Sequence, residues 1–238
     1  MTGQEIKIAW NSFYDQLITK DGYKTVLEGL LATVEIAVVG LIIGIVLGTL
    51  IALIKVTPKT NAAVRILNGV CDTYVSIFRG TPMVVQLLIG YFVILPLLNI
   101  VMAPVVVGII IFGLNSAAYV SEIMRAGIQS IDAGQLEAGR AVGLPYWTAM
   151  FKIVIPQSVK NILPTLGNEF IVLVKETSVA NFITVTDLTK AFKAIGDANY
   201  EYIFPYIALA IVYFVLVMLI TIGVKQMERG FKRNERRA

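Results

Sequence analysis

The sequence predicts an all-α membrane protein with five transmembrane helices, and three observations lead to that class. Hydrophobic residues make up 57% of the 238 residues and charged residues only 15%, whereas soluble domains carry about 25% charged residues. The apolar residues gather into five long runs, most of them able to cross a hydrocarbon core of about 30 Å as helices. Polar segments separate the runs, where loops are expected because lipid cannot solvate charges or broken backbone.

The predicted elements follow in chain order, beginning with an outer N-terminal segment at residues 1–23. Its scattered aromatic residues suit a short helix at the membrane interface, and it lacks the compact apolar run of a signal peptide. The spans are expected near Val26–Ile54, Val70–Leu98, Val101–Met124, Ile153–Val174 and Phe204–Val224. No soluble domain separates them, so residues 1–238 are predicted to form a single transmembrane domain.

Glycine and proline mark two special places in these spans. Gly40, Gly44 and Gly48 recur on one helix face, which predicts close approach of another helix, either within the subunit or from a second one. The second span is interrupted by Arg79-Gly80-Thr81-Pro82. Such a break is tolerated in a membrane only beside protein or water.

The placement of basic residues predicts the orientation. If the first span runs inward, thirteen of the 20 lysines and arginines fall on the cytoplasmic side and six on the outer side. This asymmetry follows the positive-inside rule. It predicts an outer N-terminus, an outer loop over Asp187–Glu201 and a basic cytoplasmic tail over 225–238. The net charge of +4 is thus explained by topology, and nucleic acid is not expected as a partner.

Residues 126–152 are predicted to form a cytoplasmic loop with its own helices. Asp132 suits a helix N-cap, and Gln135 completes the pattern of a capping box. A helix over about Ala133–Val142 would end at Gly143, which suits the left-handed conformation. Pro145 then suits the first turn of a second helix that leads into the fourth span.

The composition excludes several kinds of chemistry. Histidine is absent and Cys71 is the single cysteine, so the commonest general base, disulfides and thiolate metal clusters are not expected. No metal site is predicted. No Gly-x-x-x-x-Gly-Lys-Ser/Thr phosphate loop occurs, so the chain is not expected to hydrolyse ATP or to be an enzyme. Cys71 is more naturally a small buried residue.

Ionisable and amide side chains within the spans are candidates for a solute pathway, because each is costly in lipid, by about 2.5–3.5 kcal/mol at a helix centre. Asp72 and Arg79 lie two helical turns apart, about 10 Å along one face. That spacing suits the two ends of a zwitterion. The alternative is that Asp72 pairs with another residue and Arg79 neutralises carbonyls at a helix end.

The other pathway candidates are Asn115, Glu169 and Glu35. Asn115 could line the same cavity or form a hydrogen bond between helices. Glu169 lies well within the fourth span and Glu35 within the first. Glu122, by contrast, has Arg125 three residues later and is more simply read as one half of a surface helix pair.

The segment Glu137–Pro156 resembles the "EAA" loop of ABC-importer permeases. It reads Glu137-Ala138-Gly139, then Gly143, then Ile155-Pro156 after an apolar stretch, with Gly139 and Ile155 as departures from Ala and Leu. Three further segments resemble the polar amino-acid permeases, the group that carries histidine, glutamine and arginine: Tyr74–Pro82 with Gln86, Leu114–Ile128, and Lys175–Val179.

This resemblance implies a type I importer permease in a bacterial-type cytoplasmic membrane. Two permease subunits, identical or homologous, would pair with two ATP-binding subunits that hold ATP and Mg. An extracellular binding protein or domain would deliver the amino acid. The loop residues expected to couple to the ATPase are Glu137, Ala138, Gly139, Arg140, Gly143, Leu144 and Tyr146, unless Glu137 and Arg140 form an internal pair.

An ion-coupled secondary transporter of small polar solutes is the alternative function. Such transporters usually show repeated halves, and five unmatched spans do not suggest them. The small excess of acidic candidates in the spans favours a basic or neutral polar amino acid as substrate.

Overall fold

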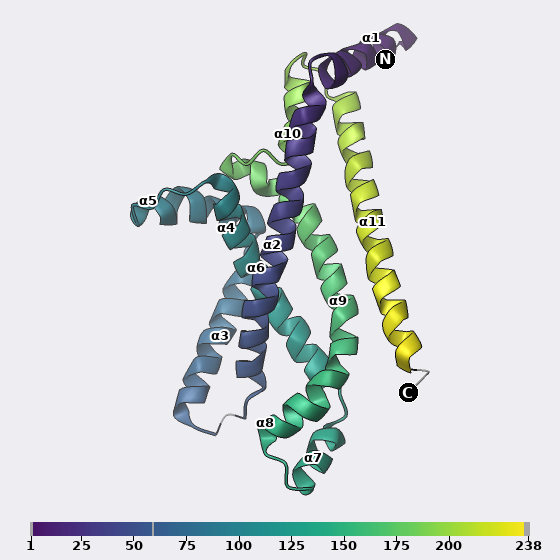
Figure 1. Cartoon of the computed structure of the whole chain (residues 1–238). Coiled ribbons are helices and arrows are strands. Elements are labelled where there is room, and N and C mark those ends of the chain that lie inside the picture. Colours follow the sequence, from purple (N-terminus) through teal and green to yellow (C-terminus); the bar gives the residue numbers. More distant parts are fainter. Residues whose placement is uncertain (1, 59, 236–238) are drawn as a thin grey trace. The chain divides into compact units, whose positions relative to one another are not determined.

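A computed structural model describes residues 2–58 and 60–235, and every regular element in those ranges is helical. The predicted all-helical class is therefore confirmed (Figure 1). The elements are α1 (Gly3–Tyr14), η1 (Asp15–Thr19), α2 (Gly22–Val56), α3 (Ala62–Gly80), α4 (Met83–Ile89), η2 (Gly90–Ile94), α5 (Leu95–Leu97), α6 (Pro104–Gln129), α7 (Ala133–Ala141), α8 (Tyr146–Ala149), η3 (Met150–Val154), α9 (Ile155–Glu176), η4 (Thr177–Ile183), α10 (Leu188–Asp197) and α11 (Ile203–Glu235). Residue 59 and residues 236–238 of the predicted tail lie outside the described residues.

Three helices are apolar and long enough to cross a membrane by length and composition: Gly22–Val56, Pro104–Gln129 and Ile203–Gly230. They correspond to the first, third and fifth predicted spans. The helices Ala62–Gly80 and Met83–Leu97 pass the same test only as a broken pair. The predicted interruption of the second span is thus confirmed, with Pro82 at the N-cap of α4.

The fourth predicted span corresponds to α9, which is helical but too polar to pass that test in the described part of the chain. Its polar side chains have partners on neighbouring elements. Asn161 donates to Ser130 Oγ at 2.8 Å, and Glu169 accepts from Ser116 Oγ at 3.2 Å. A helix whose polar groups are satisfied in this way can be membrane-embedded without being uniformly apolar, so hydropathy alone does not give a count of five spans.

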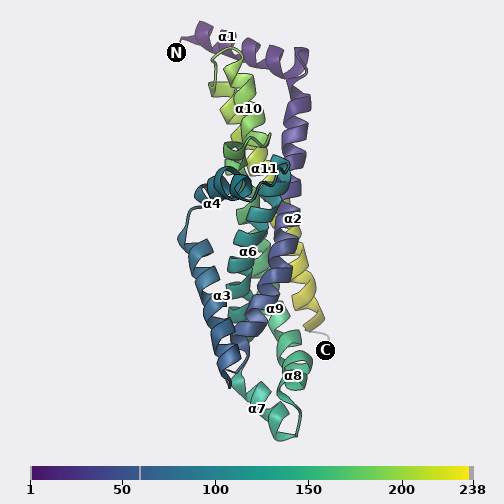
Figure 2. The same ribbon diagram turned by 90° about the vertical axis from the view of Figure 1, so that its left-hand side faces the viewer.

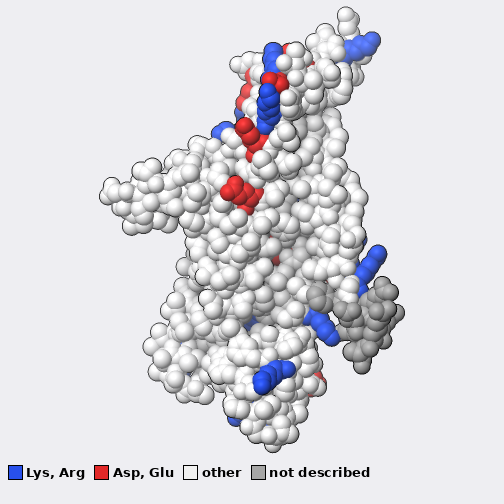
Figure 3. All heavy atoms as spheres, viewed as in Figure 1, with Lys and Arg blue, Asp and Glu red and all other residues white. Residues whose placement is uncertain are grey.

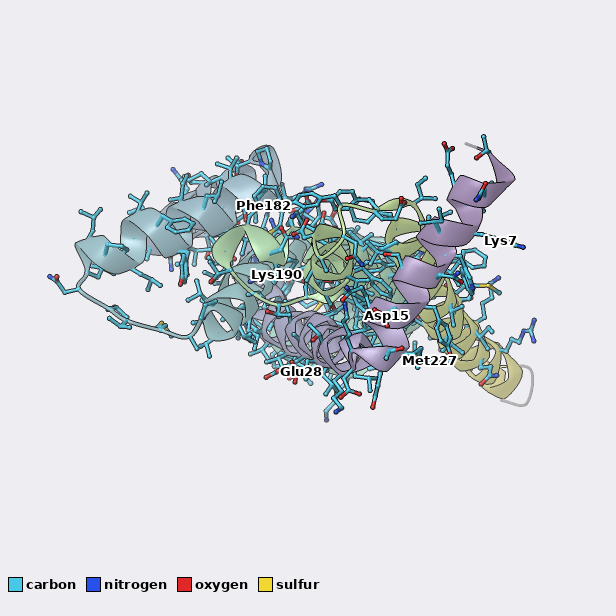
Figure 4. All side chains as sticks on the ribbon, turned by 90° about the horizontal axis from the view of Figure 1, so that it is seen from above. Lys7, Asp15, Glu28, Phe182, Lys190 and Met227 are labelled. Atoms are coloured by element: carbon cyan, nitrogen blue, oxygen red, sulfur yellow. The ribbon has the colours of Figure 1, made fainter. Side chains whose placement is uncertain are left out.

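The contacts group the chain into two compact units, and the first comprises Met1–Gly40, Thr81–Phe112 and Val172–Leu219. Its core holds Phe13, Leu188, Phe192 and Ile195, with Phe204 packed against it. In this unit α1 lies near α10 (Figure 2), and Lys7 on α1 points away from the neighbouring helices (Figure 4). Charged side chains gather over α1 and α10, whereas the long helices are mostly uncharged on the face drawn in Figure 3.

The second unit comprises Leu41–Gly80, Gly113–Ile171 and Ile220–Ala238. Here two of the predicted stripe glycines let α2 approach α6 closely. A Cβ on Gly44 would lie 2.5 Å from Ser116 Oγ, and one on Gly48 would lie 2.8 Å from Val120 Cβ. Of the two interpretations of the stripe, packing within the chain therefore holds for these two glycines. Val120 also joins a buried cluster with Ile162 and Leu166 of α9.

Candidate functional site

The predicted cytoplasmic loop forms a helix, a tight turn and a second helix, all within the second unit. Asp132 caps α7 by accepting a hydrogen bond from Gly134 N at 2.7 Å. The helix ends at a turn in which Gly143 has φ +89°, and Leu144 N donates to Gly139 O at 3.1 Å. The predicted N-cap and the predicted left-handed glycine are both confirmed.

Two details of the predicted loop are wrong. Gln135 does not complete a capping box, because its side-chain oxygen lies 3.4 Å from Gln157 Nε2 on α9 and accepts from that amide instead. Pro145 is the N-cap of α8 with extended backbone, one residue before the first helical turn. Sequence spacing could not separate these cases, since a long polar side chain near a helix start can turn toward another element.

The α7–α8 segment, defined as residues 133–149, presents charges to solvent. Glu137, Ala138, Arg140 and Gly143 are exposed, and no ion pair joins Glu137 to Arg140. The internal pairing considered above is therefore not found. Both charges are available to a partner protein.

Gly139 and Ala149 are the buried residues of this segment. A Cβ on Gly139 would lie 2.8 Å from Ile153 Cδ1 and 3.2 Å from Ala149 Cβ. These contacts are tighter than ordinary van der Waals separation, so the glycine lets α7 pack closely against α8 and η3. Leu144, half-buried at the end of the turn, lies on the same packed side.

Tyr146 joins the segment to the end of α2. Its hydroxyl donates to Val56 O at 2.9 Å. Burial raises the pKa of this hydroxyl, which keeps it protonated and able to donate. The ring is half-buried and stands edge-on to Trp147, with ring centroids 5.2 Å apart.

A charge cluster lies beside that junction and consists of Lys55, Asp72, Arg79, Glu122 and Arg125. Lys55 Nζ lies 2.9 Å from Asp72 Oδ1 and 2.7 Å from Glu122 Oε1. Arg125 Nη2 lies 2.7 Å from Glu122 Oε2, as the predicted helix pair requires. Glu122 therefore does more than pair with Arg125 on the same helix, because it is the centre of a charge network that joins α2, α3 and α6.

The two zwitterion candidates both have partners in this network. Asp72 pairs with Lys55 yet keeps 53% of its side chain exposed. Arg79 lies 3.9 Å from Glu122 and places its guanidinium 5.3 Å from the centre of the Tyr119 ring. Each residue therefore combines a structural contact with a solvent-facing portion.

The amide and carboxyl candidates are more enclosed. Asn115 is buried, and its side chain donates to Phe78 O on α3 at 3.3 Å. Glu169 is also buried and accepts from Ser116. Hydrogen bonding between helices accounts for these observed contacts. Glu35 is exposed on α2 in the first unit, and the structure does not place it with the others.

Lys55 is the member of the charge cluster that sequence reasoning missed. In the sequence analysis this lysine served only as one of the basic residues expected on the cytoplasmic side. Its carboxylate partners lie on other helices, one of them 67 residues away along the chain. Helical periodicity predicts pairs three or four residues apart and gives no signal for pairs between helices. Among the described residues, no group of three or more His, Cys, Asp or Glu side chains is placed to hold a metal ion.

Known proteins resemble this chain over most of its length. The arginine transport system permease protein ArtQ of Bacillus subtilis is 41% identical over 210 residues, which cover 88% of this chain and 94% of ArtQ. The putative glutamine transport system permease protein GlnP of Rickettsia bellii is 42% identical over 204 residues, covering 86% and 91%.

A solved structure agrees with these relatives. The crystal structure of an amino acid ABC transporter with histidines superposes with a TM-score of 0.81 at 37% identity, covering 90% of this chain and 97% of that chain. Residues 40–233 match the family described as binding-protein-dependent transport system inner membrane component, and this range includes the α7–α8 segment and the charge cluster. The chain therefore belongs to the family of inner membrane components of binding-protein-dependent transport systems.

Proposed function

We propose that this chain is the permease subunit of an ATP-driven amino-acid importer in the bacterial cell membrane. The observation that carries the proposal is the α7–α8 segment, a capped helix and glycine turn that leave Glu137 and Arg140 exposed and unpaired with each other. Family membership and relatives named as arginine and glutamine transport permeases support it. The segment would dock on a separate ATP-binding subunit, which would hold ATP and Mg.

The proposed topology has five spans, with the N-terminus outside and the C-terminus inside. Three helices and one broken pair have the required length and composition. The remaining span, fourth in chain order, is α9. Its polar groups form hydrogen bonds to Ser116 of α6 and to Ser130, which follows α6. The asymmetry of lysine and arginine supports the orientation. It puts the α7–α8 segment in the cytoplasm, as docking on an ATPase requires.

The proposed assembly contains a second permease subunit, identical or homologous, and an extracellular solute-binding protein or domain. A family named for its dependence on binding proteins supports this delivery route. The same dependence disfavours the ion-coupled secondary transporter, which would need no such protein.

The proposed substrate is a basic or neutral polar amino acid. Relatives named for arginine and glutamine support this class. The candidate pathway residues are Asp72, Arg79, Asn115, Glu169 and Glu35. The first two are favoured because they belong to one charge cluster and each keeps an exposed portion. Arg79 would hold the substrate carboxylate through its fork of donors. Asp72 would attract the ammonium group, and access would alternate between the two sides of the membrane.

Reconstitution tests the proposal directly. The chain is purified with the ATP-binding subunit that co-purifies with it and placed in liposomes with its binding protein. Radiolabelled arginine, glutamine and histidine are then supplied outside and ATP with Mg inside. Uptake that needs ATP and survives ionophores is expected. Uptake that instead follows an ion gradient without ATP would establish the secondary-transport alternative.

A further inference from the structure

The last turn of α2 receives side chains from three other parts of the second unit. The final carbonyls of a helix have no partner within the helix. Here Thr57 Oγ1 donates to Leu53 O at 2.8 Å, Asn68 Nδ2 of α3 donates to Ile54 O at 3.1 Å, and Tyr146 of α8 donates to Val56 O. The last turn of α2 is therefore held in place by Thr57, which directly follows the helix, by α3 and by the α7–α8 segment.

The same turn also carries Lys55, which belongs to the charge cluster. Lys55 precedes Val56, and only 12% of its side chain is exposed. Its ammonium group bridges Asp72 of α3 and Glu122 of α6. A partly buried ammonium group is costly unless it keeps its carboxylates. A shift of the turn must therefore carry those two carboxylates with it or break the pairs.

Asn68 makes the link to α3 stiff. It is buried, and its amide donates both to Ile54 O and to Val64 O of its own helix at 3.1 Å. The buried amide would lose a partner if α3 moved separately from the end of α2, and a buried donor without a partner is unfavourable. The last turn of α2 and the neighbouring turn of α3 thus form one mechanical piece.

The end of α2 does not fill all the space next to α7. A cavity of about 330 Å³ lies between the end of α2 and the α7–α8 segment, and Lys55, Val56, Leu136 and Tyr146 are among its lining residues. Val56 and Tyr146 both line this cavity, and the hydrogen bond between them joins the two parts directly.

We propose that the last turn of α2 is a relay, through which movement of the α7–α8 segment reaches α3 and α6. Tyr146 and Lys55 are its positioning residues: Tyr146 receives the movement at Val56, and Lys55 passes it to Asp72 and Glu122. The proposal rests on the proposed function, since it concerns how ATP hydrolysis by the partner drives transport. It also gives Tyr146 a role that differs from direct contact with the ATPase.

The test measures ATP hydrolysed per amino acid transported in the reconstituted complex. Tyr146→Phe removes one hydroxyl and keeps the ring, so assembly should be preserved. Losing a hydrogen bond worth about 0.5–1.5 kcal/mol corresponds to about a two- to tenfold rise in that ratio. Lys55→Met removes the bridging charge and should raise the ratio at least as much, while Lys55→Arg should restore part of the coupling.

Matched controls come from α10 and the loop that follows it. Tyr202 donates to Asp197 Oδ1 at 2.8 Å, and Lys193 Nζ lies 2.6 Å from Asp197 Oδ2. Tyr202→Phe and Lys193→Met therefore remove the same kinds of contact far along the chain from the relay. Neither control should change the ratio.

The double variant Tyr146→Phe/Lys55→Met shows whether the two residues act in series. A relay predicts that the double variant is no less coupled than the worse single variant, because the path is already cut. Multiplied effects would overturn the relay, as would an unchanged ratio in Tyr146→Phe. If Lys55→Met does not assemble, Tyr146→Phe still decides. No ATP-driven uptake by the unaltered chain would instead overturn the proposed function and the relay with it.

Discussion

The Arg79 side chain combines structural contacts with an exposed portion. Its guanidinium stacks on Tyr119 and approaches Glu122, yet 45% of the side chain is exposed. Arg79→Lys keeps the charge but loses the planar fork and the stacking. If Arg79 holds the substrate carboxylate, the KM for uptake should rise about tenfold, the loss expected for a hydrogen bond to a charged group.

The control for that variant is Arg125→Lys in the same cluster, because Arg125 pairs with the same Glu122 at 2.7 Å. Uptake is measured per assembled complex for both. A raised KM in Arg79→Lys alone supports substrate contact. Equal loss of assembly in the two variants, with normal KM, would assign Arg79 a structural role.

Gly143 is constrained by its backbone alone. Its φ is +89°, and nothing lies within 4 Å of the position that a Cβ would occupy. Gly143→Val should therefore strain the turn by about 1–2 kcal/mol without a steric clash. We expect insertion and assembly to persist while ATP-driven uptake falls severalfold.

Gly143→Asn separates strain from side-chain bulk, since asparagine tolerates the left-handed region better than valine. It should retain more uptake than Gly143→Val in the same liposome assay. Equal, normal uptake by both variants would show that the turn geometry does not matter for coupling.

At the residue scale, the sequence predicted what depends on local backbone chemistry. The positive φ of Gly143 and the capping by Asp132 follow from residue type and position alone. The partners of Lys55 and Gln135 could not be predicted in this way, because each reaches a side chain on another helix. Flexible side chains choose among several nearby groups, and sequence spacing does not rank them.

At the scale of the helices, the contact between α2 and α6 is set by glycine. A Cβ on Gly48 would lie 2.8 Å from Val120 Cβ and 2.9 Å from Ala117 O. Gly48→Ala should therefore overpack the contact and destabilise the protein by about 1–3 kcal/mol. Thermal unfolding in detergent is expected to shift to lower temperature.

The matched control is Gly223→Ala on α11, where nothing lies within 4 Å of the added carbon. Helix propensity alone favours alanine over glycine, so this variant should keep or gain stability. At Gly44 the clash is with the Ser116 side chain, which also donates to Glu169. Gly44→Ala/Ser116→Gly should therefore recover part of the stability expected to be lost from the sum of the two single variants. Failure of that recovery would show that the backbones, rather than the side chains, set the limit.

The sequence predicted the positions of the helices well, but it predicted less well which of them contain many polar residues. Each apolar run corresponds to a helix, and the interruption before Met83 follows from Gly80 and Pro82. In the described part of the chain α9 is too polar to pass the hydropathy test, and its polar groups bond to side chains outside the helix. Five-residue π-helical turns at Gly90–Ile94 and Met150–Val154 had no signal in the sequence.

At the scale of the whole molecule, the orientation is the property that can be tested most directly. In a Cys71→Ser background, single cysteines replace Lys193 on α10 and Arg229 on α11. An impermeant thiol reagent applied to intact cells should label position 193 and leave position 229 unlabelled until the membrane is opened. Labelling in the reverse order would invert the proposed topology and put the α7–α8 segment outside.

Gly139 also limits how the protein can be recombined with its relatives. The motif that the loop resembles has alanine at position 139, where this chain has glycine. The methyl group of such an alanine would lie 2.8 Å from Ile153 Cδ1, which is too close. A loop transplanted from a relative that carries alanine would bring such a methyl group against Ile153. Positions 139 and 153 should therefore be exchanged as a pair in chimeric permeases, and they are expected to have changed together during divergence.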